Sequence, residues 1–347
     1  MGNLFSTYSV LLPPICSAIT LLLCLAAGPL TTKLRLLDIP GGRKSHRRPT
    51  PLMGGLVLLF GFYPWVGIWI ALNPQPATIL LPVVLCAAAV TLLGLIDDRR
   101  HLSALLRLTF CFVAIVGALL WAPTLVVRAI TWNYDHGSIA LQPTVAMIFT
   151  ILSIVALIQA SNLADGKNGL LIGMCLAWIY FLGNALPDNM MPVVLGLSGV
   201  LIVLLAFNLA GALFLGDGGS YGLAAFIGFM SLVAAGAPNP HNHAASDQIG
   251  LIFLLPVLDM VRLMTVRMAR GQSPFVGDRD HLHHHLLAAF GWPGGLAAYL
   301  MMVVLPSFIA AGAPRNTLTI IALTVVVYFG VIGYAKRLVR MRNSTAT

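Results

Sequence analysis

Two adjacent carboxylates, three residues after a glycine, form one group of residues in this sequence that could do chemistry. Asp97 and Asp98 follow the run Gly94-Leu-Ile and precede Arg99 and Arg100. If that apolar run is a helix, both carboxylates lie at its C-terminus, where the helix dipole disfavours negative charge. A surface ion-pair cluster with the arginines is one interpretation. A divalent cation or a proton-transfer role is the other, because either would favour carboxylates at this position.

Two glycine-rich segments place acidic and amide side chains between apolar runs. Residues 162–170 read Asn-Leu-Ala-Asp-Gly-Lys-Asn-Gly-Leu, and residues 214–220 read Phe-Leu-Gly-Asp-Gly-Gly-Ser. Both could be capped helix–helix turns, in which Asn162 and Asp165, or Ser220, cap the helix that follows. Backbone amides at the second helix start would also suit a phosphate. The recurrence of one design, a tight turn presenting a carboxylate, favours a functional interpretation.

A histidine cluster follows the ninth apolar run. Asp280 is followed by His281, His283, His284 and His285. A three-histidine zinc site is one interpretation, but adjacent side chains on a helix diverge and no cysteine accompanies them. Hydrogen bonding to phosphate and proton transfer suit these residues better. Upstream, the spacing of Asp259 and Arg262 predicts a local salt bridge.

A basic segment, residues 38–55, combines four Lys and Arg side chains with prolines and paired glycines. One interpretation is a solvated loop that sets topology and attracts anionic lipid. The prolines and glycines also fix a backbone shape that charge alone does not require, which indicates a loop shaped for an anionic substrate.

The elements that must position these residues are membrane helices. The chain has 347 residues, of which 59% are hydrophobic and 9% charged, whereas soluble domains carry roughly 25% charged residues. This composition excludes a soluble globular protein. The five cysteines lie in apolar runs without paired spacing, so neither a disulfide framework nor a cysteine metal site is expected.

Eleven apolar stretches are each long enough to approach the roughly 20 residues that a spanning helix needs. We expect them at residues 8–29, 54–72, 77–96, 103–122, 143–161, 169–186, 191–210, 220–236, 248–266, 292–312 and 317–335. No linker or repeat divides the chain, so residues 1–347 are predicted to form a single membrane-embedded domain.

The basic residues predict the orientation of these helices. With an odd helix count, 18 of the 20 Lys and Arg residues fall on alternate ends, which places those ends in the cytoplasm, the C-terminus with them and the N-terminus outside. Eight of the 11 Asp residues fall on the same side. The positive-inside rule does not require this, so the shared face indicates a chemical site.

These motifs, in this order, resemble the polyprenyl-phosphate N-acetylhexosamine-1-phosphate transferase family, the bacterial glycosyltransferase family 4. The similarity covers about residues 38–287, and eleven helices are what the family fold implies. The His-x-His-His form is most similar to the branch that transfers N-acetylglucosamine 1-phosphate to undecaprenyl phosphate. The residues that match the family motifs are Lys44, His46, Asp97, Asp98, Asn162, Asp165, Phe214, Asp217, His281, His283 and His284.

The resemblance implies a Mg²⁺-dependent reaction, with Mn²⁺ as an alternative ion. A UDP-N-acetylhexosamine gives its sugar 1-phosphate to undecaprenyl phosphate and releases UMP, which begins the synthesis of a cell-surface polysaccharide. Asp217 is then the metal ligand, Asp97 orients or deprotonates the acceptor phosphate, and Asp98 supports it. His281, His283 and His284 join this catalytic set, in which His283 and His284 bind diphosphate. The residues expected to bind substrate, with Asp165 and Phe214 at the uridine, are Lys44, His46, Asn162, Asp165, Asn168, Asn208, Phe214 and Arg279.

The sequence departs from the family pattern at two places. Many members have Asp where this chain has Asn168, and the segment from Asn208 to Phe214 is about one residue short and lacks a basic residue before Phe214. The expected location is the bacterial inner membrane, with the site facing the cytoplasm and lipids as partners. Nucleic acid is not an expected partner, and a homodimer stays open. The alternative function, a multi-pass transporter or flippase, is disfavoured because transporters place ionisable groups near the bilayer midplane.

Overall fold

Each of the eleven apolar stretches is helical in the computed structural model, which describes residues 2–40, 48–73, 77–236, 244–274 and 280–344. Single helices account for most of them: α5 (Ala77–Arg100), α6 (Ala104–Trp121), α7 (Pro143–Ala164), α8 (Leu170–Gly183), α9 (Met191–Leu209), α10 (Gly216–Gly236), α11 (Ser246–Ala269), α13 (Gly294–Gly312) and α14 (Thr317–Ser344). The first stretch forms α1 (Gly2–Leu25) and α2 (Ala27–Leu34). The second forms α3 (Gly54–Val57), a π-helical turn at Leu58–Phe62, and α4 (Tyr63–Leu72).

The lengths of these helices confirm a polytopic, all-α membrane protein. Nine helical segments of the described chain are long and apolar enough to cross a bilayer, and α1 with α2, bent by 70°, is a tenth candidate. The eleventh, α8, has 14 residues, fewer than the roughly 20 of a full span. Several expected boundaries differ from the structure: the first helix breaks at Ala26, α10 begins four residues before position 220, and α14 continues nine residues past position 335.

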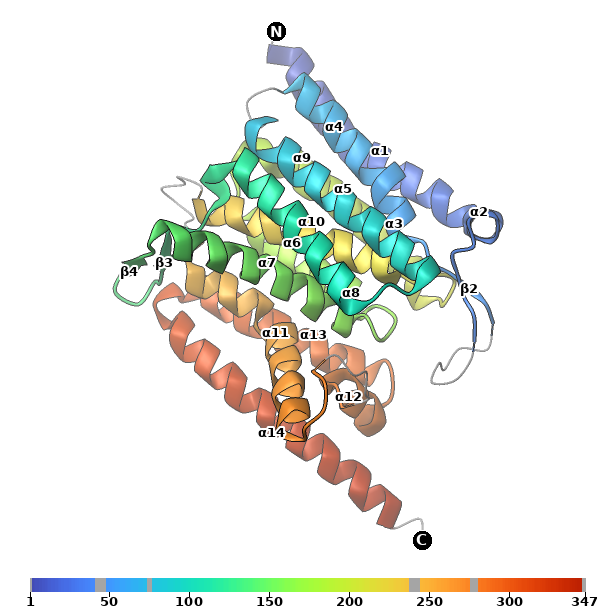
Figure 1. Cartoon of the computed structure of the whole chain (residues 1–347), viewed down its shortest axis with the longest axis vertical. Helices are drawn as coiled ribbons and strands as arrows, with labels where there is room; N and C mark the ends of the chain where they lie inside the picture. Colours follow the sequence, from blue (N-terminus) through green and yellow to red (C-terminus); the bar gives the residue numbers. More distant parts are fainter. Residues whose placement is uncertain (1, 41–47, 74–76, 237–243, 275–279, 345–347) are drawn as a thin grey trace.

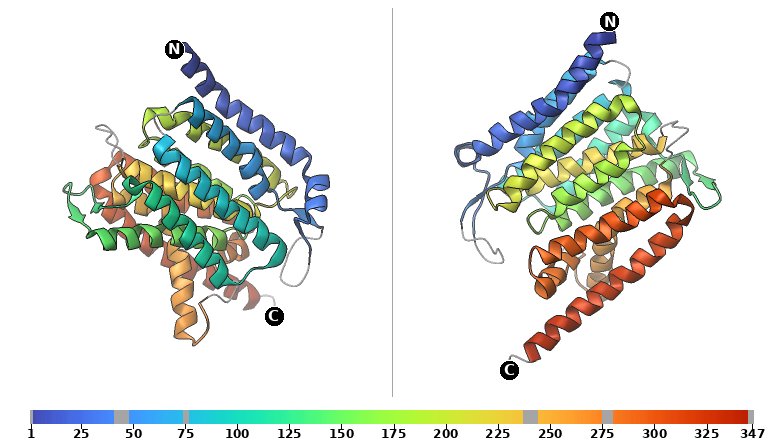
Figure 2. Two further views of the ribbon diagram at one scale, coloured as in Figure 1. Left: turned by 45° about the horizontal axis from the view of Figure 1, so that its top comes forward. Right: turned by 180° about the vertical axis from the view of Figure 1, so that it is seen from behind.

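The helix α10 lies at the centre of the bundle (Figures 1 and 2), and all its residues from Gly218 to Ala234 are buried. It packs against α5, α7 and α8. Its sequence allows this because small residues recur through its length, which lets neighbouring backbones approach closely. The polar residues at its first turn are therefore held inside the protein at one end of the bundle.

Glycines join the first turn of α10 to its neighbours. A methyl group at Gly94, in the last two turns of α5, would overlap the backbone of Asp217 and Gly218. A methyl group at Gly219 would lie 2.8 Å from the Cα atom of Gly54 in α3. These contacts require glycine for steric reasons, and they press the C-terminal end of α5 against the N-terminal end of α10.

Backbone pairing brings the first loop to the same place. The strands β1 (Leu37–Asp38) and β2 (Thr50–Pro51) pair antiparallel, and Leu52 forms a bridge to Phe214. The amide of Phe214 donates to the Pro51 carbonyl at 2.8 Å. At the opposite end, β3 (Ala129–Thr131) and β4 (Ser138–Ala140) form a second small hairpin, which is hydrogen-bonded to the start of α11.

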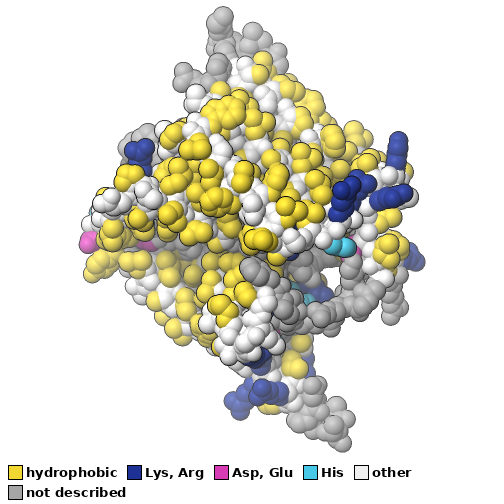
Figure 3. Space-filling model, viewed as in Figure 1, with side chains coloured by type: hydrophobic (Ala, Val, Ile, Leu, Met, Phe, Trp, Pro, Cys, Tyr) yellow, Lys and Arg dark blue, Asp and Glu magenta, His cyan; other side chains and the backbone are white. Residues whose placement is uncertain are grey.

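The surface agrees with a membrane setting. Hydrophobic side chains cover the helices in Figure 3, while Lys and Arg side chains gather at the right, near α2, and at the bottom, around the lower ends of α11 and α14. One additional helix, α12 (Leu282–Phe290), carries three of the clustered histidines and packs between α13 and α14.

Candidate active site

Four carboxylates from three helices meet at one end of the bundle. Asp97 and Asp98 are in the last turn of α5, Asp165 caps the C-terminus of α7, and Asp217 is in the first turn of α10. Each interacts electrostatically with at least one of the others. The structure thus brings together the acidic residues that the sequence predicted, and we call these four residues the carboxylate cluster.

Asp98 caps the N-terminus of α10. Its Oδ1 accepts a hydrogen bond from the Asp217 amide at 2.8 Å, and its Oδ2 accepts one from the Gly218 amide at 3.1 Å. A carboxylate that the α5 dipole disfavours is stabilised by the opposite dipole end of α10. The prediction of a glycine-rich turn before this helix is therefore wrong, because Gly216 to Ser220 form the first turn of α10 itself. Asp98 binds the backbone amides that we expected to suit a phosphate.

Asp97 is buried and bonded to protein through both oxygens. Its Oδ1 accepts from the Leu102 amide at 2.7 Å, and its Oδ2 pairs with Nη1 of Arg107 at 2.7 Å. The hydroxyl of Tyr221 lies 3.5 Å from the same Oδ2 and 3.2 Å from Arg107 Nη1. Sequence reasoning missed Arg107 and Tyr221, because they sit on two other helices and no local spacing connects them to Asp97.

Asp217 and Asp165 keep more of their bonding capacity open. Oδ1 of Asp217 accepts from Nδ2 of Asn162 at 2.6 Å, and the same Nδ2 lies 3.1 Å from the Ser220 hydroxyl. The half-buried Asp165 carboxylate accepts no hydrogen bond from the residues that the structure describes. Burial, with added repulsion from Asp217 and Asp98, raises the pKa of Asp165 to about 8.

The histidine helix α12 is anchored at its start by a buried carboxylate. Asp259 accepts hydrogen bonds from Tyr328 at 2.6 Å and from Arg262 at 3.0 Å, and it lies 3.1 Å from Nδ1 of His281, the N-cap of α12. The Leu282 amide also donates to it. The predicted Asp259–Arg262 salt bridge is confirmed, as one bond of a larger network that includes α14.

Asp280 extends this network outward. It pairs with Arg262 at 3.1 Å, with His285 at 2.7 Å and with Lys336 of α14 at 2.8 Å. Partial burial raises the pKa of Asp280, but the hydrogen bonds from Lys336 and His285 outweigh it and hold that pKa below its usual range. We refer to Asp259, Asp280 and their partners as the α12 network.

His283 lies between the α12 network and the turn that follows Asp165, and its ring stacks on that of His281 with centroids 5.3 Å apart. It is buried, and its Nε2 atom has no hydrogen-bond partner among the described residues. A methyl group at Gly166 would overlap that nitrogen, so His283 lies directly against the turn that follows Asp165. Burial, with His284 and His281 nearby, lowers the pKa of His283 to about 3, which keeps the imidazole neutral near pH 7.

The remaining predicted substrate residues surround the same turn. Asn208 is buried, and its side chain accepts from the Gly169 amide at 2.6 Å and donates to the Leu213 carbonyl at 2.9 Å. It therefore joins the two glycine-containing turns, and its expected contact with substrate stays a prediction. The Asn168 carbonyl accepts from Trp292 at 3.1 Å, and the Phe214 ring is half-buried. Lys44, His46 and Arg279 lie outside the described residues.

The cluster suits a hard divalent cation. Within the described parts of the chain, no three His, Cys, Asp or Glu side chains form a ready metal-binding group. Mg²⁺ does not need one, because it is usually held by one or two carboxylates together with water and substrate phosphates. Asp165 accepts no hydrogen bond from the described residues and Asp217 accepts one from the neutral amide of Asn162, so these two carboxylates fit that requirement. No Cys belongs to the cluster, and the described cysteines are buried and unpaired.

Comparison with known proteins gives consistent relatives. The sequence profile of Glycosyl transferase family 4 matches residues 80–235. The decaprenyl-phosphate N-acetylglucosaminephosphotransferase of Mycobacterium tuberculosis is 31% identical over 301 residues, covering 76% of this chain and 72% of the relative. The undecaprenyl-phosphate alpha-N-acetylglucosaminyl 1-phosphate transferase of Yersinia pestis is 29% identical, covering 74% and 71%, and that of Escherichia coli K12 is 27% identical, covering 78% and 74%.

Proposed function

The chain belongs to glycosyl transferase family 4, and we propose that it transfers N-acetylglucosamine 1-phosphate from UDP-N-acetylglucosamine to undecaprenyl phosphate. The observation that carries this proposal is the meeting of Asp97, Asp98, Asp165 and Asp217 with the histidine helix at one end of a membrane bundle. A soluble nucleotide sugar and a membrane-held phosphate can both reach such a position. Its products would begin a cell-surface polysaccharide at the bacterial inner membrane.

The reaction exchanges one phosphorus–oxygen bond for another. An oxygen of the acceptor phosphate attacks the β-phosphorus of the UDP-sugar, and the bond from that phosphorus to the α,β-bridging oxygen breaks. UMP leaves with the bond electrons, and the lipid product is a polyprenyl diphospho-sugar. Catalysis of this kind depends mainly on positioning and charge neutralisation.

Asp217 and Asp165 would hold the divalent ion in this proposal. When bound, Mg²⁺ would neutralise the charge of the donor diphosphate. The amide of Asn162 fixes one Asp217 oxygen by its 2.6 Å hydrogen bond, and the Asp217 carboxyl also contacts that of Asp97. Because four carboxylates repel one another when ionised, a bound cation would relieve the repulsion as well as serve the reaction.

Arg107 is the residue that we assign to an anionic substrate group. Asp97 has both oxygens bonded to protein, so we favour an orienting role for it over proton abstraction. Its partner Arg107 uses only Nη1 in bonds to described residues. The other guanidinium N–H groups are then available to a phosphate, which Arg binds with two parallel donors.

The histidines of α12 would contact the donor from the side opposite the carboxylate cluster. His283 is neutral at cytoplasmic pH and presents an unpartnered Nε2 next to Gly166. A neutral imidazole can donate one hydrogen bond to diphosphate without adding charge. The transporter alternative has no comparable support, because the acids of the cluster lie at helix ends and the relatives are transferases.

Assays of the purified chain in lipid nanodiscs would test the proposal. We expect UMP release from UDP-N-acetylglucosamine that requires both undecaprenyl phosphate and Mg²⁺, with Mn²⁺ as a substitute, and a radiolabelled lipid product. UDP-N-acetylgalactosamine and UDP-glucose serve as donor controls. Acceptor-independent release of UMP, or no release with any donor while the protein stays folded, would contradict the proposed reaction.

A further inference from the structure

Tyr221 is a buried tyrosine to which the reaction proposed above assigns no role. It follows Asp217 by four residues on α10, so the two side chains lie on the same face of that helix. Its side chain is fully buried, and its hydroxyl reaches both Asp97 and Arg107. A buried tyrosine hydroxyl usually finds a hydrogen-bond partner. Here that partner is the cation that we assign to an anionic substrate group.

The hydroxyl closes a triangle of polar atoms from three helices. Nη1 of Arg107 on α6 pairs with Oδ2 of Asp97 on α5 at 2.7 Å, and it donates to the Tyr221 hydroxyl at 3.2 Å. A guanidinium has donors only, so the hydroxyl must accept from Arg107, and its own proton is left to point at the same Asp97 oxygen, 3.5 Å away. The two N–H groups of Nη1 are therefore both used.

Two bonds to one nitrogen fix a guanidinium more tightly than one bond does. With the Asp97 bond alone, the group could still turn about that bond. The guanidinium is planar and its N–H groups point in fixed directions, so the second bond, to the Tyr221 hydroxyl, fixes its plane. The Arg107 side chain is 27% exposed, which leaves its outer edge open to a ligand. Holding an arginine in its binding geometry in advance lowers the entropy lost when the ligand binds.

The surroundings of Arg107 favour the lipid acceptor as its ligand over the nucleotide sugar. Phe110 follows Arg107 by three residues and is therefore its neighbour on the surface of α6. Phe110 is 42% exposed and Leu106 is 51% exposed, on a helix long and apolar enough to span the bilayer. Such side chains contact lipid in a membrane, so a membrane-held phosphate can reach Arg107 from the lipid side.

We propose that Tyr221 is the positioning residue of Arg107. Its hydroxyl holds the guanidinium in the plane in which Nη2 and Nε offer two parallel donors to the phosphate of the lipid acceptor. Tyr221 is buried and acts only through Arg107. This role rests on the proposed function, because it takes the acceptor phosphate as the ligand of Arg107. A tyrosine that only packed α10 into the bundle would affect both substrates alike.

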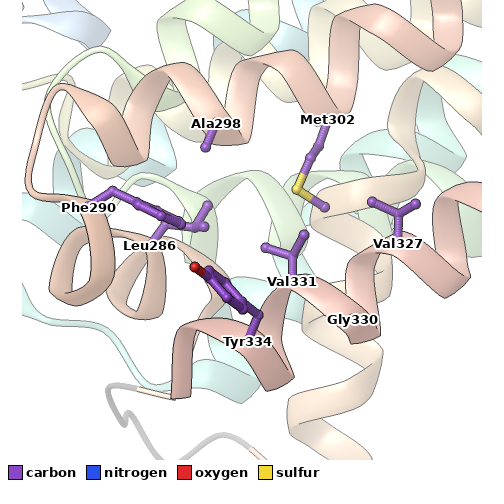
Figure 4. Close-up of a pocket in the computed structure, with 8 residues that line it drawn as sticks. All are labelled: Leu286, Phe290, Ala298, Met302, Val327, Gly330, Val331 and Tyr334. Carbon is purple, nitrogen blue, oxygen red and sulfur yellow. The ribbon is translucent and has the colours of Figure 1, made fainter. Parts of the chain in front are cut away.

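Three tyrosines provide a test variant and two controls. Tyr221→Phe removes the hydroxyl and keeps the ring. Tyr63→Phe is the matched control, because the buried Tyr63 hydroxyl also donates to α10, at the Gly222 carbonyl 3.2 Å away, but makes no bond to Arg107. Tyr334→Phe is the second control. Tyr334 lines the groove between α12, α13 and α14 in Figure 4, and its hydroxyl makes no hydrogen bond with the described residues.

Native mass spectrometry without donor or metal ion would measure acceptor binding, with undecaprenyl phosphate as the probe and undecaprenol as its neutral control. We expect Tyr221→Phe to raise the Kd for undecaprenyl phosphate about threefold to tenfold, the net effect of one hydrogen bond, and to leave the Kd for undecaprenol unchanged. In the transfer assay, the KM for the acceptor should rise by a similar factor while the KM for UDP-N-acetylglucosamine stays that of the parent. Both control variants should bind and transfer like the parent.

A double-mutant cycle tests whether Tyr221 acts through Arg107. Arg107→Lys keeps the positive charge but removes the planar fork, so the hydroxyl no longer has a plane to fix. Tyr221→Phe should then add nothing to the Kd for undecaprenyl phosphate that Arg107→Lys already shows. Residues that act as one unit give non-additive effects of this kind.

Three results would overturn this role of Tyr221. Acceptor binding by Tyr221→Phe equal to that of the parent would show that the hydroxyl does not set the Arg107 guanidinium. An equal rise of the Kd for undecaprenyl phosphate and for undecaprenol would assign Tyr221 to packing. Additive effects in the cycle would separate Tyr221 from Arg107. The binding measurements need no catalysis, so a parent that shows the expected binding pattern but releases no UMP would contradict the proposed function and support the positioning role.

Discussion

The carboxylate cluster and the α12 network lie at the same end of the molecule but satisfy their buried charges differently. In the network, Asp259 and Asp280 each have three or more partners, among them Arg262 and Lys336. In the cluster, four carboxylates share one described cation, Arg107. Buried charges are costly unless they are paired. A region that leaves them unpaired is therefore built for a ligand, while the paired region is built to hold a helix in place.

The cluster avoids collapse because its acids are fixed by backbone and amide groups instead of cations. Asp98 is bonded to two backbone amides of α10, and Asp217 is bonded to Asn162. These neutral donors position the carboxylates without neutralising them. The carboxylates therefore stay available to the divalent ion that we propose, and perturbed groups of this kind are typical of functional sites.

The largest effect should come from removing charge at the open side of the cluster. Asp217→Asn keeps the side-chain volume but weakens any metal contact, so we expect the transfer rate at saturating Mg²⁺ to fall at least about a thousandfold, or roughly 4 kcal/mol in barrier. Thermal melting in detergent should show a folded protein. Asp188→Asn, an exposed acid at the opposite end, is the control. A loss smaller than about tenfold would mean that Asp217 is not the metal ligand.

A smaller effect on rate and a clear effect on stability should follow from opening the α12 network. Tyr328→Phe removes a hydroxyl that donates to Asp259 at 2.6 Å and accepts from Arg262 at 2.7 Å. Bonds to charged groups contribute about 1.5–3 kcal/mol, so the melting temperature should fall and kcat should drop moderately as α12 loosens. Tyr334→Phe, on the same helix without such bonds, is the control. A thousandfold loss of kcat in a folded Tyr328→Phe protein would show that the α12 network takes part in catalysis and does not only hold the helix in place.

How far the sequence predicted this arrangement depends on the range of each interaction. Hydropathy located all eleven helical segments, and the motifs located the four acids, because both signals are local. The partners Arg107 and Tyr328 were missed because their bonds connect helices whose pairing no local pattern gives. The role of Asp98 was also missed: its bonds to α10 depend on the close approach at Gly94, which became visible only with the fold.

Removing the Asp98 cap should have an intermediate effect. Asp98→Asn replaces one acceptor with an amide donor that faces the N–H groups of α10. Caps contribute about 0.5–2 kcal/mol, and the helix dipole adds up to about 1 kcal/mol. We therefore expect a lower melting temperature and a modest loss of activity that Mg²⁺ does not restore. Restoration of full activity by excess Mg²⁺ would show that Asp98 acts as a metal ligand instead.

The pKa of Asp165 gives a pH-dependent test of the open cluster. The folded-state pKa of about 8 lies above the usual value of about 3.9, so the folded protein holds this proton where the unfolded chain has lost it. Stability in the absence of metal should then fall as the pH rises from about 4 to about 8. Asp165→Asn removes this dependence. In the presence of a chelator, its melting temperature should be higher than that of the parent at pH 9 and equal to that of the parent at pH 4. A parent whose melting temperature rises over that range would contradict the assignment.

The smallest effect is expected at Asn168, where the chain departs from the family pattern at the edge of the cluster. Its carbonyl is fixed by Trp292, so the backbone there does not depend on the side chain, and Asn168→Asp should fold. If the side chain contacts the nucleoside, Asp keeps an acceptor but loses a donor. Activity should persist with an altered KM for the UDP-sugar, and Asn168→Ala should weaken donor binding by about 0.5–1.5 kcal/mol. Identical donor profiles for the parent and both variants would show that Asn168 only shapes the turn, and that donor contacts on this side of the cluster end at Asp165.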